Sequence, residues 1–190
     1  MDDDALLRAL ARDLDGSFEA LVRSHADRCY SIALRILGDP SDAEEVAQDA
    51  FVRAYRALGT YEPARIRDLR LRPWLATIVV NACRSRVTRR RPLTVSLADM
   101  PDTVRSPHRA EIPHEHLASR EAATRWADLI GGLPSRYRAA VVLRHVDGLS
   151  YEEMSEVLGR PEGTIRAQVH RGLALLRAAV EAAEREESIA

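Results

Sequence analysis

The sequence predicts an all-α fold of two small helical domains joined by a flexible linker, on three observations. Aromatic residues make up only 5% of the 190-residue chain, whereas alanine, leucine and arginine, which favour helices, are abundant. Apolar residues recur at helical spacing in two separate stretches. Between these stretches, residues 92–117 contain four prolines and no apolar period. We therefore expect one domain over residues 1–91 and another over residues 118–190.

The first domain is expected to open with a short helix around residues 6–10, followed by a longer one. The apolar pattern of the longer helix covers residues 18–36 and stops at the Gly-Asp-Pro sequence of residues 38–40. Ser41, with Glu44 three residues later, has the spacing of a capping box, which closes the first turn of a helix. We therefore predict a second long helix that starts after Ser41.

A third helix is predicted in the basic part of the first domain. Gly59 is expected to end the second helix, and an arginine-rich stretch over residues 65–72 follows. Proline suits the first turn of a helix, because its missing N–H would have no helical partner there. Pro73 therefore indicates the start of the third helix, whose apolar positions run from Trp74 to Val87.

Apolar periodicity returns at about residue 117 and is interrupted at Leu133 and Pro134. A further helix is predicted over residues 135–146, since Asp147 and Gly148 form a terminator.

The stretch from Ser150 to Arg171 has the features of a helix-turn-helix. Ser150 and Glu153 have the spacing of a capping box, and Gly159 permits a sharp turn before the second helix. Outward positions of that helix carry side chains able to contact base edges or phosphates in a major groove. An ordinary helical hairpin with solvated charges is the alternative. The candidate DNA-binding residues are Thr164, Arg166, Gln168, His170 and Arg171.

Charge is segregated along the chain, although the total is only -1. Residues 1–50 carry twelve acids against five arginines, a net charge of -7. Residues 65–91 carry nine arginines against one aspartate, a net charge of +8. This pattern predicts one surface that binds nucleic acid and another that binds a basic protein.

Several short motifs occur along the chain: DAEEVAQDAF at 42–51, WLATI at 74–78 with Asn81, LPSRYR at 133–138, GLSYEEM at 148–154 and GTIR at 163–166. The sequence resembles sigma factors of the extracytoplasmic-function (ECF) group, which direct bacterial RNA polymerase to promoters. The first motif resembles region 2.2, the second the segment that reads the minus-10 element, and the last three region 4. The resemblance covers residues 17–91 and 120–178, in the family's order.

This resemblance implies that the first domain binds core RNA polymerase and the minus-10 element, and that the second domain reads the minus-35 element. It also implies control by an anti-sigma factor. The residues implied at the polymerase are Glu44, Glu45, Gln48 and Asp49, an acidic face suited to a basic partner. Those implied at the minus-10 element are Tyr61, Trp74, Asn81, Arg84 and Arg86; for Trp74, packing in the core is the alternative.

The chain departs from the family pattern at a few positions. Val79-Val80 stands where Ala-Arg is usual, so recognition of the minus-10 bases is expected to differ. Met154-Ser155 replaces a commoner Ile-Ala pair and Gly172 replaces a usual alanine. We interpret these as packing changes that leave the DNA-binding face intact.

No metal or other cofactor is predicted. The His-Glu-His sequence at residues 114–116 lacks a scaffold that gathers further ligands, and Cys29 and Cys83 lack ligand spacing, so we expect reduced thiols. No apolar run is long enough to span a membrane, and Asp2–Asp4 stand where a signal peptide carries positive charge. We therefore expect a cytoplasmic protein without membrane insertion.

Two other classes of function are alternatives to this interpretation. A helix-turn-helix regulator that binds an operator and never contacts polymerase would account for residues 150–171, but not for the acidic helix or the basic first domain. An enzyme acting on DNA would need a nucleophile or an acidic metal-binding cluster, and the basic region offers one aspartate. We therefore expect no catalytic residues.

Overall fold

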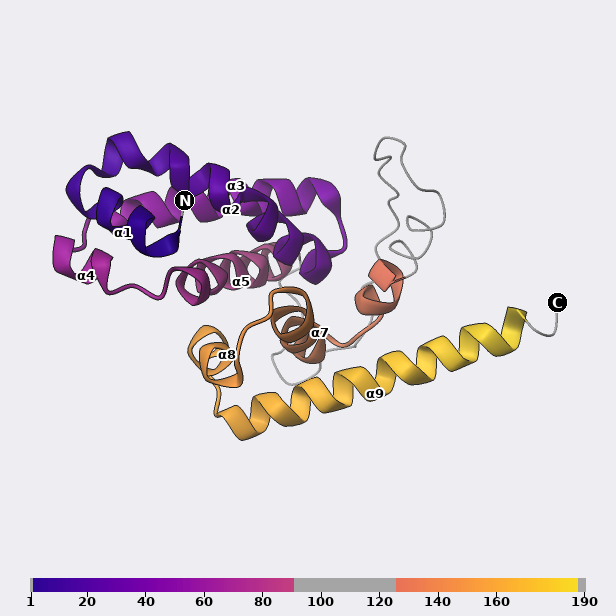
Figure 1. Cartoon of the computed structure of the whole chain (residues 1–190). Helices are drawn as coiled ribbons and strands as arrows, with labels where there is room; N and C mark the ends of the chain where they lie inside the picture. Colours follow the sequence, from indigo (N-terminus) through magenta and orange to yellow (C-terminus); the bar gives the residue numbers. More distant parts are fainter. Residues whose placement is uncertain (1, 91–125, 188–190) are drawn as a thin grey trace.

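The computed structural model describes residues 2–90 and 126–187, and within these ranges the chain is helical and contains no strand. The predicted all-α fold is thus confirmed, while the predicted linker over 92–117 lies outside the described residues. The first part consists of α1 (Asp3–Arg12), α2 (Leu14–Leu37), α3 (Pro40–Leu58), α4 (Pro63–Arg67) and α5 (Leu71–Arg90); the second contains α7 (Ser135–Val141), the π-helix η1 (Val142–Val146), α8 (Tyr151–Leu158) and α9 (Glu162–Glu187) (Figure 1).

The start of α3 differs from the prediction. Asp39, not Ser41, is the N-cap, and its side chain accepts a hydrogen bond of 2.8 Å from the backbone N–H of Asp42. Pro40 then occupies the first helical position. The prediction was wrong because the fixed φ of a proline already suits the first turn, so the residue before it takes the capping role.

Three further features of the helices differ from the expectation. Helix α5 begins at Leu71, two residues before Pro73. The short helix α4 within the arginine-rich stretch was not predicted. The helix predicted over 135–146 changes from α to π at Val142, and the looser turn lets the backbone N–H of Asp147 bond to the carbonyl of Val142 at 3.0 Å.

The first part is built around α2, which packs along α3 and α5, while α1 packs against α2 and α4. Leucines and isoleucines that are almost completely buried fill the space between these helices. The free thiols of Cys29 and Cys83 are buried among them. The fully buried anchors include Leu6, Leu21, Ile32, Leu58 and Leu75.

In the second part, α9 crosses α7 at Gly172. A Cβ atom at Gly172 would lie 2.5 Å from Cγ2 of Val141 and 3.4 Å from Cβ of Tyr137. The missing side chain therefore lets the two helices approach closely. This close crossing places α9 along the side of α7 that carries Tyr137 and Val141.

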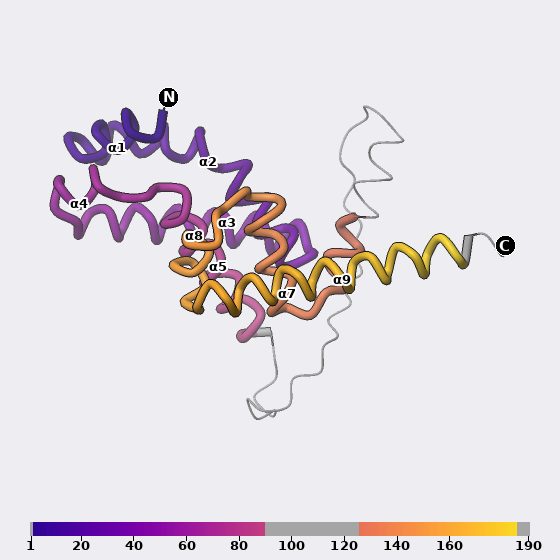
Figure 2. Tube along the Cα trace, turned by 60° about the horizontal axis from the view of Figure 1, so that its bottom comes forward, coloured from indigo at the N-terminus to yellow at the C-terminus, as the bar shows by residue number. Residues whose placement is uncertain are grey.

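The two parts contact one another. Helix α8 packs against α5, and η1 and α7 pack against α2. Figures 1 and 2 show α8 beside α5 from two directions, with α9 continuing past α7 toward the C-terminus. The helix-turn-helix is therefore held against the basic helix of the first part.

Candidate nucleic-acid interface

The predicted helix-turn-helix is formed by α8 and α9. The capping box is present: the backbone N–H of Glu153 donates to the hydroxyl of Ser150 at 3.1 Å, and the N–H of Ser150 donates to the carboxylate of Glu153 at 2.7 Å. Gly159 ends α8 with φ of 64°, in the left-handed region that favours glycine. Ile165 and Val169 then bury the inner side of α9. These contacts fix which face of α9 is turned outward.

The predicted DNA-binding residues lie on the first three turns of α9. The outward face carries both positive charge and neutral donors, as major-groove contacts require. Gln168 is half-buried, whereas the other four predicted residues, Thr164, Arg166, His170 and Arg171, are exposed.

One edge of this face is formed around Tyr151, the first residue of α8. The guanidinium carbons of Arg144 and Arg166 each lie 4.9 Å from the centre of its ring, a cation–π distance. Arg144 also donates to the carbonyl of Leu149 at 2.8 Å. This edge is therefore a basic surface held by stacking and by a backbone hydrogen bond.

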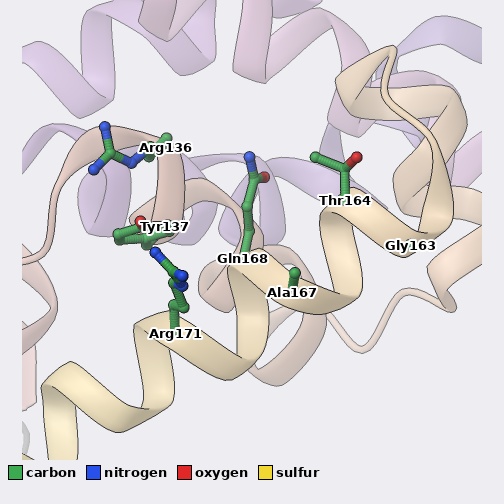
Figure 3. A pocket seen from close by; sticks show the side chains of 7 residues that line it. All are labelled: Arg136, Tyr137, Gly163, Thr164, Ala167, Gln168 and Arg171. Carbon is green, nitrogen blue, oxygen red and sulfur yellow. The ribbon is translucent and has the colours of Figure 1, made fainter.

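The other edge is formed by α7. An open groove of about 470 Å³ runs between α7 and α9, lined by Arg136, Tyr137, Gly163, Thr164, Ala167, Gln168 and Arg171 (Figure 3). The guanidinium carbon of Arg136 lies 4.7 Å from the centre of the Tyr137 ring. Hydrogen bonding by the side chains of Arg136 and Arg171 lowers the pKa of the Tyr137 hydroxyl.

The four residues predicted at the polymerase lie together on α3. Glu44, Glu45 and Gln48 are exposed and Asp49 is half-buried. Glu45 already accepts a hydrogen bond of 2.6 Å from Arg86 on α5. Glu44 accepts a hydrogen bond of 3.4 Å from Gln48, and Asp49 forms an ion pair of 2.7 Å with Arg53, so both bond to neighbours on α3 itself.

Arg86, predicted at the minus-10 element, is directed toward α3. Its Nε and Nη2 donate to one oxygen of the buried Asp42 at 3.0 and 2.7 Å, in addition to the bond with Glu45. These bonds join α5 to α3, so the structure gives Arg86 a role in packing. Asn81 and Arg84 lie on the exposed side of the same helix, and Nη1 of Arg84 donates to the side-chain oxygen Oδ1 of Asn81 at 3.3 Å.

Two of the residues predicted at the minus-10 element, Tyr61 and Trp74, lie beside each other in the structure. The rings of Tyr61 and Trp74 are 6.3 Å apart in an edge-to-face arrangement, and both side chains are half-buried. Arg65 lies over the ring of Tyr61, with its guanidinium carbon 3.8 Å from the ring centre. Trp74 also packs against the hydrophobic core, so its ring already has a structural role.

Polar contacts join the two parts at residues that the sequence did not single out. Arg28 donates to both carboxylate oxygens of Asp147 at 2.5 Å, and Arg72 donates to the Asp147 carbonyl at 2.7 Å. Arg70 pairs with three carboxylates of α8, and their charges outweigh the effect of burial and raise the pKa of Arg70. Those partners are Glu152 at 3.5 Å, Glu153 at 3.3 Å and Glu156 at 2.9 Å.

Only some of the residues at this interface could have been predicted from the sequence. The arginine-rich stretch was recognised as a basic surface, but nothing local shows that Arg70 meets the glutamates of α8, 82 or more residues away. Arg136 and Tyr137 belong to a motif whose position was noted, without a role for either side chain. Burial and the positive charge of Arg160, on the second part, lower the pKa of Arg84.

Within the described ranges, no group of histidine, cysteine and acidic side chains could hold a metal ion, and no helix is long and apolar enough to cross a membrane. The His-Glu-His sequence at 114–116 lies outside the described residues.

Family models match both parts of the chain. The model of Sigma-70 region 2 matches residues 21–92, and the model of Sigma-70 region 4 matches residues 124–176. The two matches occur in the order that the motifs indicated.

Curated relatives carry the same description. The ECF RNA polymerase sigma factor SigE of Mycolicibacterium smegmatis is 38% identical over 164 residues, which cover 85% of this chain and 60% of that protein. The chain thus spans less than two thirds of this relative. The ECF RNA polymerase sigma factor SigW of Bacillus subtilis is 30% identical over 167 residues, which cover 85% of this chain and 87% of that protein.

Two solved structures resemble the whole arrangement. CnrH, solved in complex with the cytosolic domain of CnrY, has a TM-score of 0.67 and 28% identity, covering 95% of this chain and 99% of CnrH. The sigma factor RpoE of Bartonella quintana, solved with the anti-sigma factor NepR, has a TM-score of 0.64 and 22% identity, covering 86% of this chain and 96% of RpoE. At 22% identity, the likeness to RpoE shows a shared fold.

Proposed function

The chain belongs to the ECF group of RNA polymerase sigma factors, and from this premise we propose that it binds core RNA polymerase and directs initiation at promoters with its own minus-35 and minus-10 elements. The observation that carries the proposal is a helix-turn-helix with an exposed basic face on the same chain as an acidic helix face and a basic helix. An operator-binding regulator needs only the first of these features.

In this proposal α9 enters the major groove of the minus-35 element. Arg166 and Arg171 are placed to contact guanine edges or phosphates, and Thr164, Gln168 and His170 supply further polar groups. The buried side of α9 keeps these residues turned outward, so the helix enters the groove without rearranging its own packing.

Helix α5 binds the minus-10 element in the same proposal. The exposed Asn81 and Arg84 lie on one side of it, and the edge-to-face pair Tyr61 and Trp74 lies near its start. Stacking on aromatic rings and contacts to a basic groove are the usual means of holding unpaired bases. Arg86 supports this surface from behind through its bonds to Asp42 and Glu45.

The acidic face of α3 is the proposed docking surface for core polymerase. Glu44, Gln48 and Asp49 form an acidic patch beside the ion pair of Glu45 with Arg86. An acidic patch raises the rate at which a basic partner associates and fixes its orientation.

The two DNA-binding surfaces cannot reach their elements in the described arrangement. The minus-35 and minus-10 elements lie about 25 base pairs apart, on the order of 85 Å of B-form DNA. Helix α8 instead packs directly on α5. We therefore propose that the two parts separate when the factor binds polymerase, and that the described form is the one held by an anti-sigma factor. The partners solved with CnrH and RpoE support a protein of this kind.

We expect the protein to act in the cytoplasm, where the transcription machinery lies, and to catalyse no reaction itself. Co-elution with purified core polymerase on gel filtration tests the proposal against its rival. A sigma factor should co-elute with core enzyme and retain a promoter fragment only in that complex. A regulator of the operator-binding class should bind DNA alone and elute separately from core enzyme.

A further inference from the structure

The groove between α7 and α9 is a second basic edge of the DNA-binding face, and we infer that Arg136 and Arg171, with the hydroxyl of Tyr137, bind a backbone phosphate of the minus-35 duplex. This inference rests on the proposed function, because it takes the insertion of α9 into a major groove as given. It adds Arg136 and Tyr137, from a different helix, to the residues that contact DNA.

The position of the groove relative to the outward face of α9 supports this assignment. Arg166 and Arg171 are five residues apart on α9, so their side chains leave the helix about 140° apart. Arg166 points to the edge around Tyr151, as its 4.9 Å distance from that ring requires. Arg171 points to the opposite edge, toward Tyr137 (Figure 3). A helix in a major groove has a sugar–phosphate backbone on each side, and both edges therefore face phosphates.

The two edges have the same composition. At one, Tyr151 is contacted by Arg144 and Arg166. At the other, Tyr137 is contacted by Arg136, through its ring, and by the side chain of Arg171, through its hydroxyl. In each case one arginine comes from α9 and the other from the continuous helical segment of α7 and η1, residues 135–146. This arrangement places two guanidinium groups at each edge of the inserted helix.

The chemistry of the α7–α9 groove suits a phosphate. Guanidinium groups bind phosphate oxygens through paired, charge-assisted hydrogen bonds. Arg136 and Arg171 line the same groove as Tyr137, so an anion bound there meets both guanidinium groups. The depressed pKa of Tyr137 reflects the same positive potential. Thr164 adds a further hydroxyl to the lining.

The close crossing of the helices fixes this geometry. Gly172 follows Arg171 directly, and its missing Cβ allows the backbone to lie against Val141 and Tyr137. Tyr137 itself is buried, so its ring is a rigid surface beneath the two arginines. The groove is therefore assembled before DNA arrives, which lowers the cost of ordering it on binding.

The test uses holoenzyme and a fluorescent promoter duplex that the wild-type holoenzyme transcribes. Arg136→Ala should weaken binding about tenfold, as expected for loss of a charge-assisted hydrogen bond. It should also reduce the slope of log affinity against log salt concentration by about one. Tyr137→Phe should weaken binding less and leave that slope unchanged, because it removes no charge.

A set of duplexes with single neutral methylphosphonates across the minus-35 element locates the contact. One substitution should weaken the wild-type holoenzyme more than it weakens Arg136→Ala, because only Arg171 and the Tyr137 hydroxyl still contact that phosphate in the variant. The matched control is Arg185→Ala, which removes the same charge from the exposed end of α9, where Arg185 bonds to its own helix at Glu181. It should bind like the wild type.

Arg136 is exposed, so its replacement should leave the melting temperature unchanged. If wild-type holoenzyme binds and transcribes the promoter while Arg136→Ala has the same affinity, salt slope and methylphosphonate profile, the phosphate assignment is wrong and the proposed function stands. If the wild-type chain gives no promoter binding with core polymerase, the proposed function itself fails.

Discussion

Arg28 on α2 and Asp147 after η1 form an ion pair across the two parts of the chain, although 119 residues separate them. Both Nε and Nη2 of Arg28 lie 2.5 Å from the carboxylate oxygens, in the bidentate geometry that arginine favours with a carboxylate. The Asp147 side chain is 1% exposed, so no solvent can replace the arginine without movement of the parts. This pair connects the helix-turn-helix to the first domain.

Replacing Arg28 should therefore separate the two parts. Arg28→Gln leaves the buried Asp147 carboxylate without its cation, which costs about 3 kcal/mol for a buried pair. Small-angle scattering should show a larger radius of gyration for the free protein. The apparent affinity for core polymerase should rise, because more of the protein is already in the separated form. Arg35→Gln is the control, since Arg35 bonds to Ser31 on its own helix. Unchanged dimensions and affinity would contradict the proposed separation.

Gly172→Ala should destabilise the second part. The added Cβ would lie 2.5 Å from Cγ2 of Val141, and overpacking of this kind costs about 1–3 kcal/mol. Chemical denaturation measures the change. Gly163→Ala, on the same helix with nothing within 4 Å of the new Cβ, should be neutral or slightly stabilising. In a Val141→Ala background the Gly172→Ala substitution should cost much less, and an equal cost there would place the strain elsewhere.

Reversing the acidic face of α3 should weaken polymerase binding. Glu44 and Asp49 are better targets than Glu45, because Glu45 also holds Arg86. Glu44→Arg with Asp49→Arg should reduce core affinity about tenfold, by slowing association with a basic partner. The control, Glu181→Arg with Glu184→Arg, makes the same charge change on the exposed end of α9. Surface plasmon resonance with core enzyme distinguishes them, and equal affinities would remove the docking assignment.

Asn81→Ala should slow the opening of promoter DNA. Asn81 is exposed on α5, where its side-chain oxygen Oδ1 accepts from Arg84, and loss of one base contact should slow open-complex formation about tenfold. A template with a pre-melted minus-10 bubble should restore most of the rate. Thr88→Ala, about two helical turns further along, where the hydroxyl donates to the backbone carbonyl of Arg84, should behave like the wild type. A defect of equal size on both templates would argue against a role in melting.

The sequence was sufficient for features that depend on neighbouring residues. The capping box of Ser150 and Glu153, the turn at Gly159 and the apolar face of α9 are all local, and each was predicted correctly. The cap of α3 was placed two residues too late, because Ser41 and Glu44 also fit the spacing of a capping box. Local patterns compete at such a site, and only the backbone decides between them.

Features that depend on tertiary packing could not be predicted. Arg86 lies in an arginine-rich segment and was therefore predicted to bind DNA, but its side chain bonds to Asp42 on another helix. Asp147 was interpreted as a helix terminator, whereas its carboxylate pairs with Arg28. In both cases the partner lies at least 44 residues away, and a sequence pattern contains no information about which distant charges meet. The α7–α9 groove was missed for the same reason.

Transcription from a genomic fragment library by core polymerase and the purified chain tests the central claim most directly, with the RNA 5′ ends mapped by sequencing. The account predicts new start sites that require the chain and that share one upstream element near position -35 and another near -10. Arg166→Ala with Arg171→Ala should abolish most of these starts. The absence of any start beyond those of core enzyme alone, from a chain that nevertheless binds the same DNA, would contradict it.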